Sequence, residues 1–414
     1  MRNATALLVS LLALIPGACT REEPVTTATT KPAEIPKYTT AIEADFDTDN
    51  LLNLAYGASV VSRTAEATID SSAVHAIDST MRTGWMSPPS SPEQTIVFSL
   101  LVPARLERIG VLNSDADIDS PSTVTFETSS DGVQWRLLQT LQTKGGEEPQ
   151  LWDVTPTVAH YIRVSTTGNS TIAVRSFQAL GVELQPPVLP PLEGCWRIND
   201  VPARFARDGA TITGILGTTP PTLIDGGTNG RVVELMWTQG PMWGYGVITL
   251  APNAATLSGL RIHEEISTQQ YGEGWFGDRV PCDGITLAAP QPGTLTSRAP
   301  NDRWSAYGIV FDANDAIVAE PSRAALDALA KRIAAAPSQR FRITAHELRN
   351  AGAVENRRQT EKRIASLRAA MSARGVDGSR LEFVSAGDQW SEPPIATALQ
   401  RLMASRIDLE RFGR

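Results

Sequence analysis

Three polar residues near the C-terminus have types and a spacing suited to binding chemistry. Asn356 and Arg363 lie seven residues apart in NRRQTEKRI at 356–364, which is two helical turns, so a helix would place both on one face. Glu347 ends the preceding stretch ITAHE at 343–347. A guanidinium beside a carboxylate suits a ligand that carries a carboxylate beside an ammonium. The alternative is that Arg363 is a surface or fold-stabilising arginine within a basic helix.

The elements that must position these residues are predicted by alternating strand and helix patterns. Apolar residues recur at helical spacing in 321–333, where Ser322 is the expected N-cap. They recur again from Ile364 to Met371, and Gly375 is expected to end that helix. Strands are predicted at 308–313, 340–347, 381–388 and 405–411. The order is β-α-β-α-β, typical of an α+β domain.

This order, at 303–414, resembles the OmpA-like peptidoglycan-binding domain. VFDAND at 310–315 matches the F-D opening of the family, and Asn356 and Arg363 match its N-x-x-L-S-x-x-R-A helix. The family also has a G-H-T-D loop before that helix, whose Asp grips the diaminopimelate of the wall peptide. Leu348 stands at the position of that Asp.

The resemblance implies that Arg363 and Asn356 bind peptidoglycan, with Glu347 as the one nearby replacement for the missing carboxylate. Neighbouring residues of an extended segment point to opposite sides, so Glu347 compensates only if the loop leaves strand geometry. The alternative is an envelope scaffold whose OmpA-like domain has lost diaminopimelate binding and mediates protein-protein contacts. An apolar Leu348 suits such a contact.

The segment at 41–185 is predicted to be a β-sandwich, because short β-branched and aromatic runs alternate with polar residues. It resembles a discoidin, or coagulation-factor type C, domain with a galactose-binding-like jelly-roll. The motifs are AIDSTMRTGW at 76–85, SSDGVQW at 129–135, AHYIRV at 159–164 and FQALG at 177–181. That family binds glycans, lipids or proteins through loops at one end of the sandwich. Trp85 and Trp135 are expected to pack in the core.

The same resemblance implies a structural calcium ion near the first motif, where Asp78 and Thr83 are candidate ligands. A calcium shell needs more than one carboxylate. The acidic residue that the family places near its last strand is Ser176 or Gln178 here. We therefore expect no cofactor, and Asp78 and Thr83 remain weak candidates.

The first residues predict export from the cytoplasm. A basic start and an apolar run too short to span a bilayer are followed by Pro-Gly-Ala-Cys at 16–19, which resembles a bacterial lipobox. The prediction is a signal peptide at 1–18, lipidation of Cys19 and a disordered tether at 19–40. Thr20 after the cysteine would direct the lipoprotein to the outer membrane, facing the periplasm. The alternative is ordinary cleavage that leaves Cys19 as a free thiol.

Between linkers at 186–192 and 287–302, the segment at 193–286 is predicted to be a small antiparallel β-barrel or sandwich, because short strands recur about every ten residues. Its Cys195 and Cys282 are expected to form a disulfide, since disulfides persist in exported proteins. A pair of free buried thiols is the alternative. No ligand is predicted for this domain.

Composition and motifs favour a non-catalytic binding protein. The net charge is −8, but the residues from 303 onward carry 18 Lys and Arg against 13 Asp and Glu, so this part is basic. Export makes nucleic acid an unsuitable partner for it. The chain lacks the G-x-S-x-G, Walker and H-E-x-x-H motifs. Peptidoglycan and a glycan or envelope protein are the expected partners. A glycan hydrolase hidden in the middle domain would be a third possibility, which no residue pattern predicts.

Overall fold

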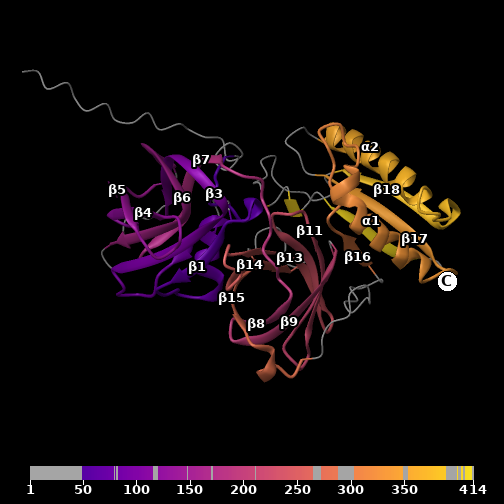
Figure 1. The fold of residues 1–414 in the computed structure, drawn as a ribbon, viewed down its shortest axis with the longest axis horizontal. Helices are drawn as coiled ribbons and strands as arrows, with labels where there is room; N and C mark the ends of the chain where they lie inside the picture. Colours follow the sequence, from indigo (N-terminus) through magenta and orange to yellow (C-terminus); the bar gives the residue numbers. More distant parts are fainter. Residues whose placement is uncertain are drawn as a thin grey trace, which may run out of the picture. The chain divides into compact units, whose positions relative to one another are not determined.

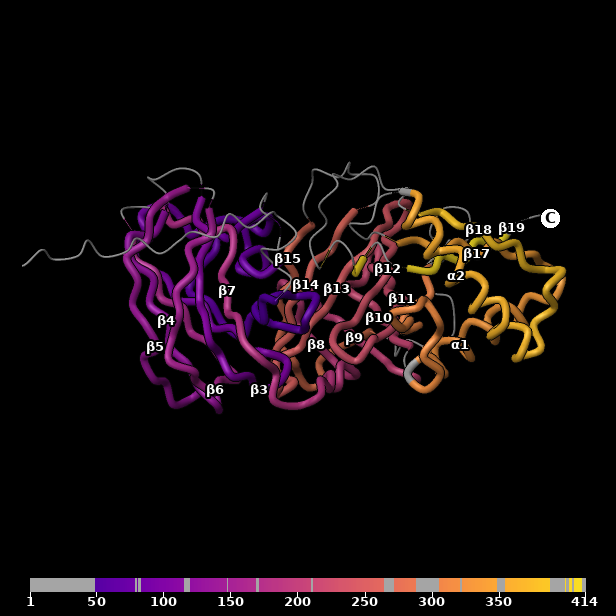
Figure 2. The backbone as a smooth tube through the Cα atoms, turned by 90° about the horizontal axis from the view of Figure 1, so that it is seen from above, coloured from indigo at the N-terminus to yellow at the C-terminus, as the bar shows by residue number. Residues whose placement is uncertain are grey.

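The computed structural model describes residues 49–412, with gaps at 79, 81–82, 115–119, 147, 169–170, 210, 264–271, 288–302, 348–352, 388–398, 400–401 and 404–405. Several expectations fall on residues outside this description: the signal peptide at 1–18, Cys19 and its tether at 19–40, the linker at 287–302 beyond its first residue, and Leu348. The described strands form three sheets, which Figures 1 and 2 show in order along the chain.

Seven strands form the first sheet, in the order β2-β7-β3-β6-β4-β5 with β1 paired to β3. Their bounds are β1 (Ser59–Arg63), β2 (Trp85–Met86), β3 (Glu93–Asn113), β4 (Thr123–Ser129), β5 (Arg136–Gln142), β6 (Gln150–Thr167) and β7 (Ala173–Glu183). Short 3-10 helices η1 (Leu54–Tyr56), η2 (Ile69–Ser71) and η3 (Ala73–Ile77) precede β2. The sequence predicts strands throughout this segment, and the structure confirms them.

The 21-residue strand β3 bends the sheet into a sandwich. Its pairing register with β6 shifts between Ser99 and Ala104 and again between Leu106 and Arg108, and such bulges bend a strand. A straight strand of this length would span about 70 Å. Instead, loops at both of its ends are joined by hydrogen bonds at one rim of the sandwich. The bend buries a core that includes Phe98, Phe126 and Phe177.

The second sheet is a closed antiparallel barrel of eight strands, in the order β10-β11-β12-β13-β14-β15-β8-β9. The bounds are β8 (Gly194–Ile198), β9 (Val201–Asp208), β10 (Thr211–Leu216), β11 (Thr222–Thr228), β12 (Val233–Gln239), β13 (Met242–Leu250), β14 (Thr256–His263) and β15 (Glu273–Val280). Cys195 of β8 and Cys282 of the 3-10 helix η4 (Cys282–Gly284) form the predicted disulfide, with their Cα atoms 5.2 Å apart.

Side chains fill the inside of the barrel. Along β12, Val233, Leu235 and Trp237 point inward and join the barrel core, so the alternation of a strand points Glu234 and Met236 outward. The Trp237 indole donates to the carbonyl oxygens of Tyr245 and Ile262, both at 3.1 Å. The aromatic residues Trp196, Phe205, Trp237 and Trp275 are therefore part of the barrel core.

The third sheet has the order β16-β19-β17-β18, with β17 and β18 parallel and the other pairs antiparallel. Its strands are β16 (Arg303–Ala306), β17 (Arg340–His346), β18 (Leu381–Gly387) and β19 (Ile407–Phe412). Two helices, α1 (Ala319–Ala334) and α2 (Ala353–Ser372), accompany it, and the 3-10 helix η6 (Gly378–Arg380) precedes β18. None of the described helices is both long and apolar enough to cross a membrane.

Two details of this sheet differ from the sequence prediction. The run at 308–313 is not a strand: Phe311 makes one isolated bridge with Ile317, and the first strand is β16. Ser322 lies inside α1 rather than at its N-cap. Its buried hydroxyl hydrogen-bonds the backbone of Val310 instead of capping the helix. The inner face of α2 is as predicted, with Ile364, Leu367 and Met371 buried.

Candidate functional site

The helix α2 and the end of β17 bring the predicted binding residues together. Asn356 and Arg363 both lie in α2, and both are buried, at 1% and 6% exposure. Glu347 directly follows β17 and is also buried. Arg363 Nη1 forms an ion pair with Glu347 Oε2, so the carboxylate next to position 348 does reach the guanidinium. Leu348 itself lies outside the described residues.

A second carboxylate, which the sequence analysis did not single out, also holds Arg363. Arg363 Nε donates to Asp315 Oδ1 at 3.1 Å, and the guanidinium stacks over the Phe311 ring at 4.6 Å. Asp315 has a φ of 65° in the turn after Phe311, a left-handed conformation that Asp tolerates better than most residues. Asp315 is the last residue of the VFDAND motif, and that motif was the signal that could have found it. With two carboxylates for one guanidinium, this cluster suits an added cation.

A neighbouring cluster at the ends of β17 and β19 surrounds Asp408. Its carboxylate accepts hydrogen bonds from Arg406 Nε at 3.1 Å and from Ser305 Oγ at 2.6 Å, and lies 3.0 Å from His346 Nε2. All of these side chains are buried. Burial alone would lower the pKa of Arg406, but Asp408 raises it above its ordinary value. His346 is therefore a buried residue at the end of strand β17.

The rim of the sandwich is the second candidate region. Gly168 N donates to Pro92 O at 2.9 Å next to the start of β3, while Asn113 Nδ2 at the end of β3 donates to Lys144 O at 2.7 Å. Two further backbone bonds complete the connection: Ser122 N to Thr167 O, and Thr143 N to Ser122 O. The described parts of four loops therefore meet at one end of the sandwich, at 87–92, 114–122, 143–149 and 168–172.

Asp78, the first calcium candidate, organises its own loop. Its carboxylate is buried and accepts from Thr83 Oγ1 at 2.7 Å and from Thr80 N at 3.0 Å, and it lies 2.8 Å from His75 Nδ1. Both oxygens are thus engaged by the protein, and Thr83 is a partner of Asp78. Ser176, at the family's acidic position, is buried as well. Within the described residues, no three His, Cys, Asp or Glu side chains are grouped to hold a metal ion.

The two tryptophans of the sandwich motifs have different environments. Trp85 is 1% exposed, which agrees with the core position expected for it. Trp135 is only partly buried, and the guanidinium of Arg163 lies 4.6 Å from its ring centre. Glu127 holds that guanidinium through two hydrogen bonds of 2.6 Å. Trp135 is therefore covered by a polar pair on the sheet surface, which differs from the expected core packing.

Comparison with known proteins identifies part of the chain. Residues 59–177 match the family model of the F5/8 type C domain, so this segment is a domain of that family. No curated protein matches the chain.

Solved structures that resemble the chain each cover about a third of it. The C-terminal domain of a chitobiase from Bacteroides fragilis is 21% identical, with a TM-score of 0.30 over 31% of this chain and 96% of that chain. Chitosan-binding module 1 of a chitosanase/glucanase from Paenibacillus sp. IK-5 is 23% identical, with a TM-score of 0.28 over 31% and 98%. The family 32 carbohydrate-binding module of Streptococcus pneumoniae EndoD is 13% identical, with a TM-score of 0.28 over 31% and 99%.

Proposed function

We propose that this chain is a non-catalytic cell-envelope protein that binds a glycan through the rim of its F5/8 type C domain. The observation that carries the proposal is the family match of residues 59–177. The hydrogen bonds that gather four loops at one end of the sandwich support it, because discoidin-like domains bind through such loops. The exposed Lys144 at this rim offers a donor to sugar hydroxyl groups.

Affinity electrophoresis of the full chain in gels that contain purified polysaccharides tests the proposal. We expect at least one glycan to retard the wild-type protein, and Lys144→Ala to reduce the retardation several-fold. The matched control is Arg105→Ala, because Arg105 is half exposed on the part of β3 that lies away from the rim. If the wild type binds a glycan and the two variants, Lys144→Ala and Arg105→Ala, change that binding equally, the site lies elsewhere than at the rim.

We further propose that the C-terminal part is an OmpA-like domain that contacts peptidoglycan through Arg363, Asn356 and Glu347. The ion pair between Arg363 and Glu347 supports this, because it restores a carboxylate beside the guanidinium despite Leu348. Diaminopimelate carries an ammonium beside a carboxylate. The excess negative charge contributed by Asp315 favours the ammonium, and the guanidinium fork favours the carboxylate.

A pull-down of the full chain with purified peptidoglycan tests this mechanism. Arg363→Ala should abolish retention, whereas Arg358→Ala should leave it unchanged, because Arg358 lies exposed on the same helix and pairs with Glu355. Leu348→Asp should strengthen retention, since it restores the carboxylate of the family motif. Retention that Arg363→Ala leaves intact would rule out the diaminopimelate mechanism.

The second candidate function is an envelope scaffold in which this domain holds a protein partner. The burial of Arg363 between Asp315 and Glu347 favours it, because an arginine with both partners inside the fold also serves as a structural residue. In that case wild-type protein would show no retention on peptidoglycan. A co-purifying envelope protein would then be lost on Leu348→Asp, and that result would favour the scaffold.

A further inference from the structure

A cavity of about 200 Å³ lies against the outer face of the barrel strand β12. The residues that line it come from the barrel, from the segment after β16, from α2 and from the approach to β19. The polar and aromatic lining includes Glu234 and Asn229 of the barrel, Tyr307 and Phe311, Arg363, and Arg406. A cavity of about 150 Å³ suffices for a molecule of the size of benzene. This one therefore has room for a small ligand.

Glu234 lines this cavity from an outward position on β12. The residue is only 9% exposed, and Asn229 Nδ2 donates to its Oε1 at 3.2 Å. The Asn229 side-chain oxygen accepts from the backbone amides of Arg231 and Val232, so the orientation of the amide group is set. Among the described residues, Asn229 is the hydrogen-bond partner of Glu234, and no cationic side chain pairs with it.

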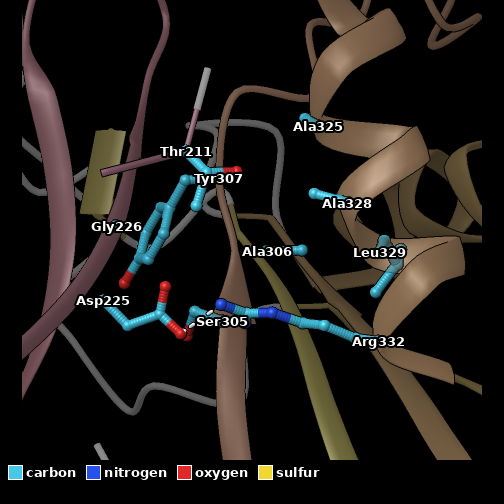
Figure 3. Close-up of a pocket in the computed structure, with 10 residues that line it drawn as sticks. All are labelled: Thr211, Asp225, Gly226, Ser305, Ala306, Tyr307, Ala325, Ala328, Leu329 and Arg332. Carbon is cyan, nitrogen blue, oxygen red and sulfur yellow. Dashed lines mark hydrogen bonds and ion pairs between the residues drawn. The ribbon is translucent and has the colours of Figure 1, made fainter. Parts of the chain in front are cut away.

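Asp225 on the adjacent strand β11 is a second buried carboxylate of the barrel, and it has a cationic partner. It also points outward and is buried, but Arg332 of α1 forms an ion pair with it. Figure 3 shows this pair across a small space bordered by Ser305 and Tyr307. A buried carboxylate without such a cation is costly, which is why proteins normally pair it. Glu234, unlike Asp225, has no such cation among the described residues.

The two guanidinium groups in the cavity do not supply the missing cation. Arg363 is held by Asp315 and Glu347, and Arg406 by Asp408. Among the described residues that line the cavity, these arginines and Tyr307 are the charged or titratable groups beside Glu234. Burial raises the pKa of Glu234 to about 8, so an empty cavity leaves the carboxyl protonated at neutral pH.

We propose that this cavity binds a primary ammonium group on a short apolar stem, with Glu234 as its counter-ion. The ammonium would donate to the Glu234 carboxylate, which releases its proton on binding. Ile309, Val310 and Ile407 of the lining would surround the stem. The excess carboxylate charge around Arg363 and Arg406 offsets their repulsion of the cation. The site goes beyond the proposed function, because it requires neither glycan nor peptidoglycan binding.

Calorimetric titration of the full chain with n-pentylamine, and with neutral n-pentanol as a probe of equal length, tests the proposal. At pH 7 we expect pentylamine to bind with release of nearly one proton, seen as a binding enthalpy that depends on the ionisation enthalpy of the buffer. Its affinity should rise as the pH increases from 6 to 8, by up to about tenfold per unit. Glu234→Gln should weaken binding by at least about tenfold.

The matched control is Asp278→Asn, which removes an exposed carboxylate from the barrel strand β15 and should leave the affinity unchanged. Glutamine keeps the shape of the protonated acid, and a thermal melt at pH 5 verifies that the variant folds. Equal pentylamine binding by the wild type and by folded Glu234→Gln would overturn the proposal. So would pentanol binding as tight as pentylamine binding, or an affinity that does not rise with pH.

Discussion

Arg363 contacts two carboxylates, and the two have different origins in the chain. Glu347 comes from the end of a strand beside the family's ligand position, whereas Asp315 comes from a turn 48 residues before the arginine. Replacing either partner leaves a guanidinium with one counter-ion. Replacing Arg363 leaves two buried carboxylates together, which is the more costly state. The Arg363→Ala variant must therefore be shown to be folded before its loss of peptidoglycan binding is interpreted.

At the same scale, Glu234 should make the stability of the folded protein depend on pH. Its folded-state pKa of about 8 lies above the ordinary value of 4.5, because burial disfavours the charged form. Between these values the folded state holds a proton that the unfolded state has released, so the free energy of unfolding falls as the pH rises. A glutamine does not ionise, so the Glu234→Gln variant does not lose stability in this way. We therefore expect it to be more stable than the wild type at pH 7.

Chemical denaturation at pH 5 and pH 7 measures the effect. The stability difference between Glu234→Gln and the wild type should grow by about 2 kcal/mol between these pH values. Asp278→Asn is again the control, because it removes an exposed carboxylate from the same barrel. A difference that is the same at both pH values would mean that Glu234 is ionised in the folded protein.

At the scale of the elements, the pair of Arg332 and Asp225 joins helix α1 to strand β11. The side chains are 10% and 4% exposed, and burial raises the pKa of Asp225 while Arg332 opposes that rise. Arg332→Ala would leave the carboxylate buried without a cation. We expect the variant to lose about 3 kcal/mol of stability in chemical denaturation.

Arg323→Ala provides the comparison within the same helix. Arg323 is 63% exposed and pairs with Glu320 three residues away, so its removal should cost no more than about 0.5 kcal/mol. Equal losses for the two variants would contradict the assigned role of the pair between Arg332 and Asp225.

At the scale of the whole molecule, the predicted lipid anchor is independent of the described fold. If Cys19 is acylated, the wild-type protein should sediment with outer membranes, and Cys19→Ala should release it into the soluble envelope fraction. Metabolic labelling with a radioactive fatty acid should mark the wild type alone. A soluble wild-type protein without label would favour ordinary signal cleavage, and would leave the two binding proposals untouched.

Local sequence patterns predicted much of the secondary structure. The inner face of α2 follows from the spacing of Ile364, Leu367 and Met371, because helix periodicity is a property of neighbouring residues. The strand predicted at 308–313 does not form, although the run is apolar enough for one, because β19 pairs with β16 and β17 instead. Strand pairing depends on distant partners that a local pattern does not contain.

The candidate sites also contain features that the local sequence predicted and features that only the folded chain created. Residue types and order alone were sufficient to propose a discoidin-like family for the sandwich and the disulfide of Cys195 with Cys282. They named Glu347 only as a conditional replacement for the missing carboxylate, and the folded chain shows that it pairs with Arg363. The burial of Glu234 and the ion pair between Asp315 and Arg363 are seen only in the folded chain. Both depend on which surfaces cover a side chain, and those surfaces come from segments far away in the sequence. Burial then determines the charge state of Glu234, because the cost of an ionised carboxylate depends on the solvent and partners around it.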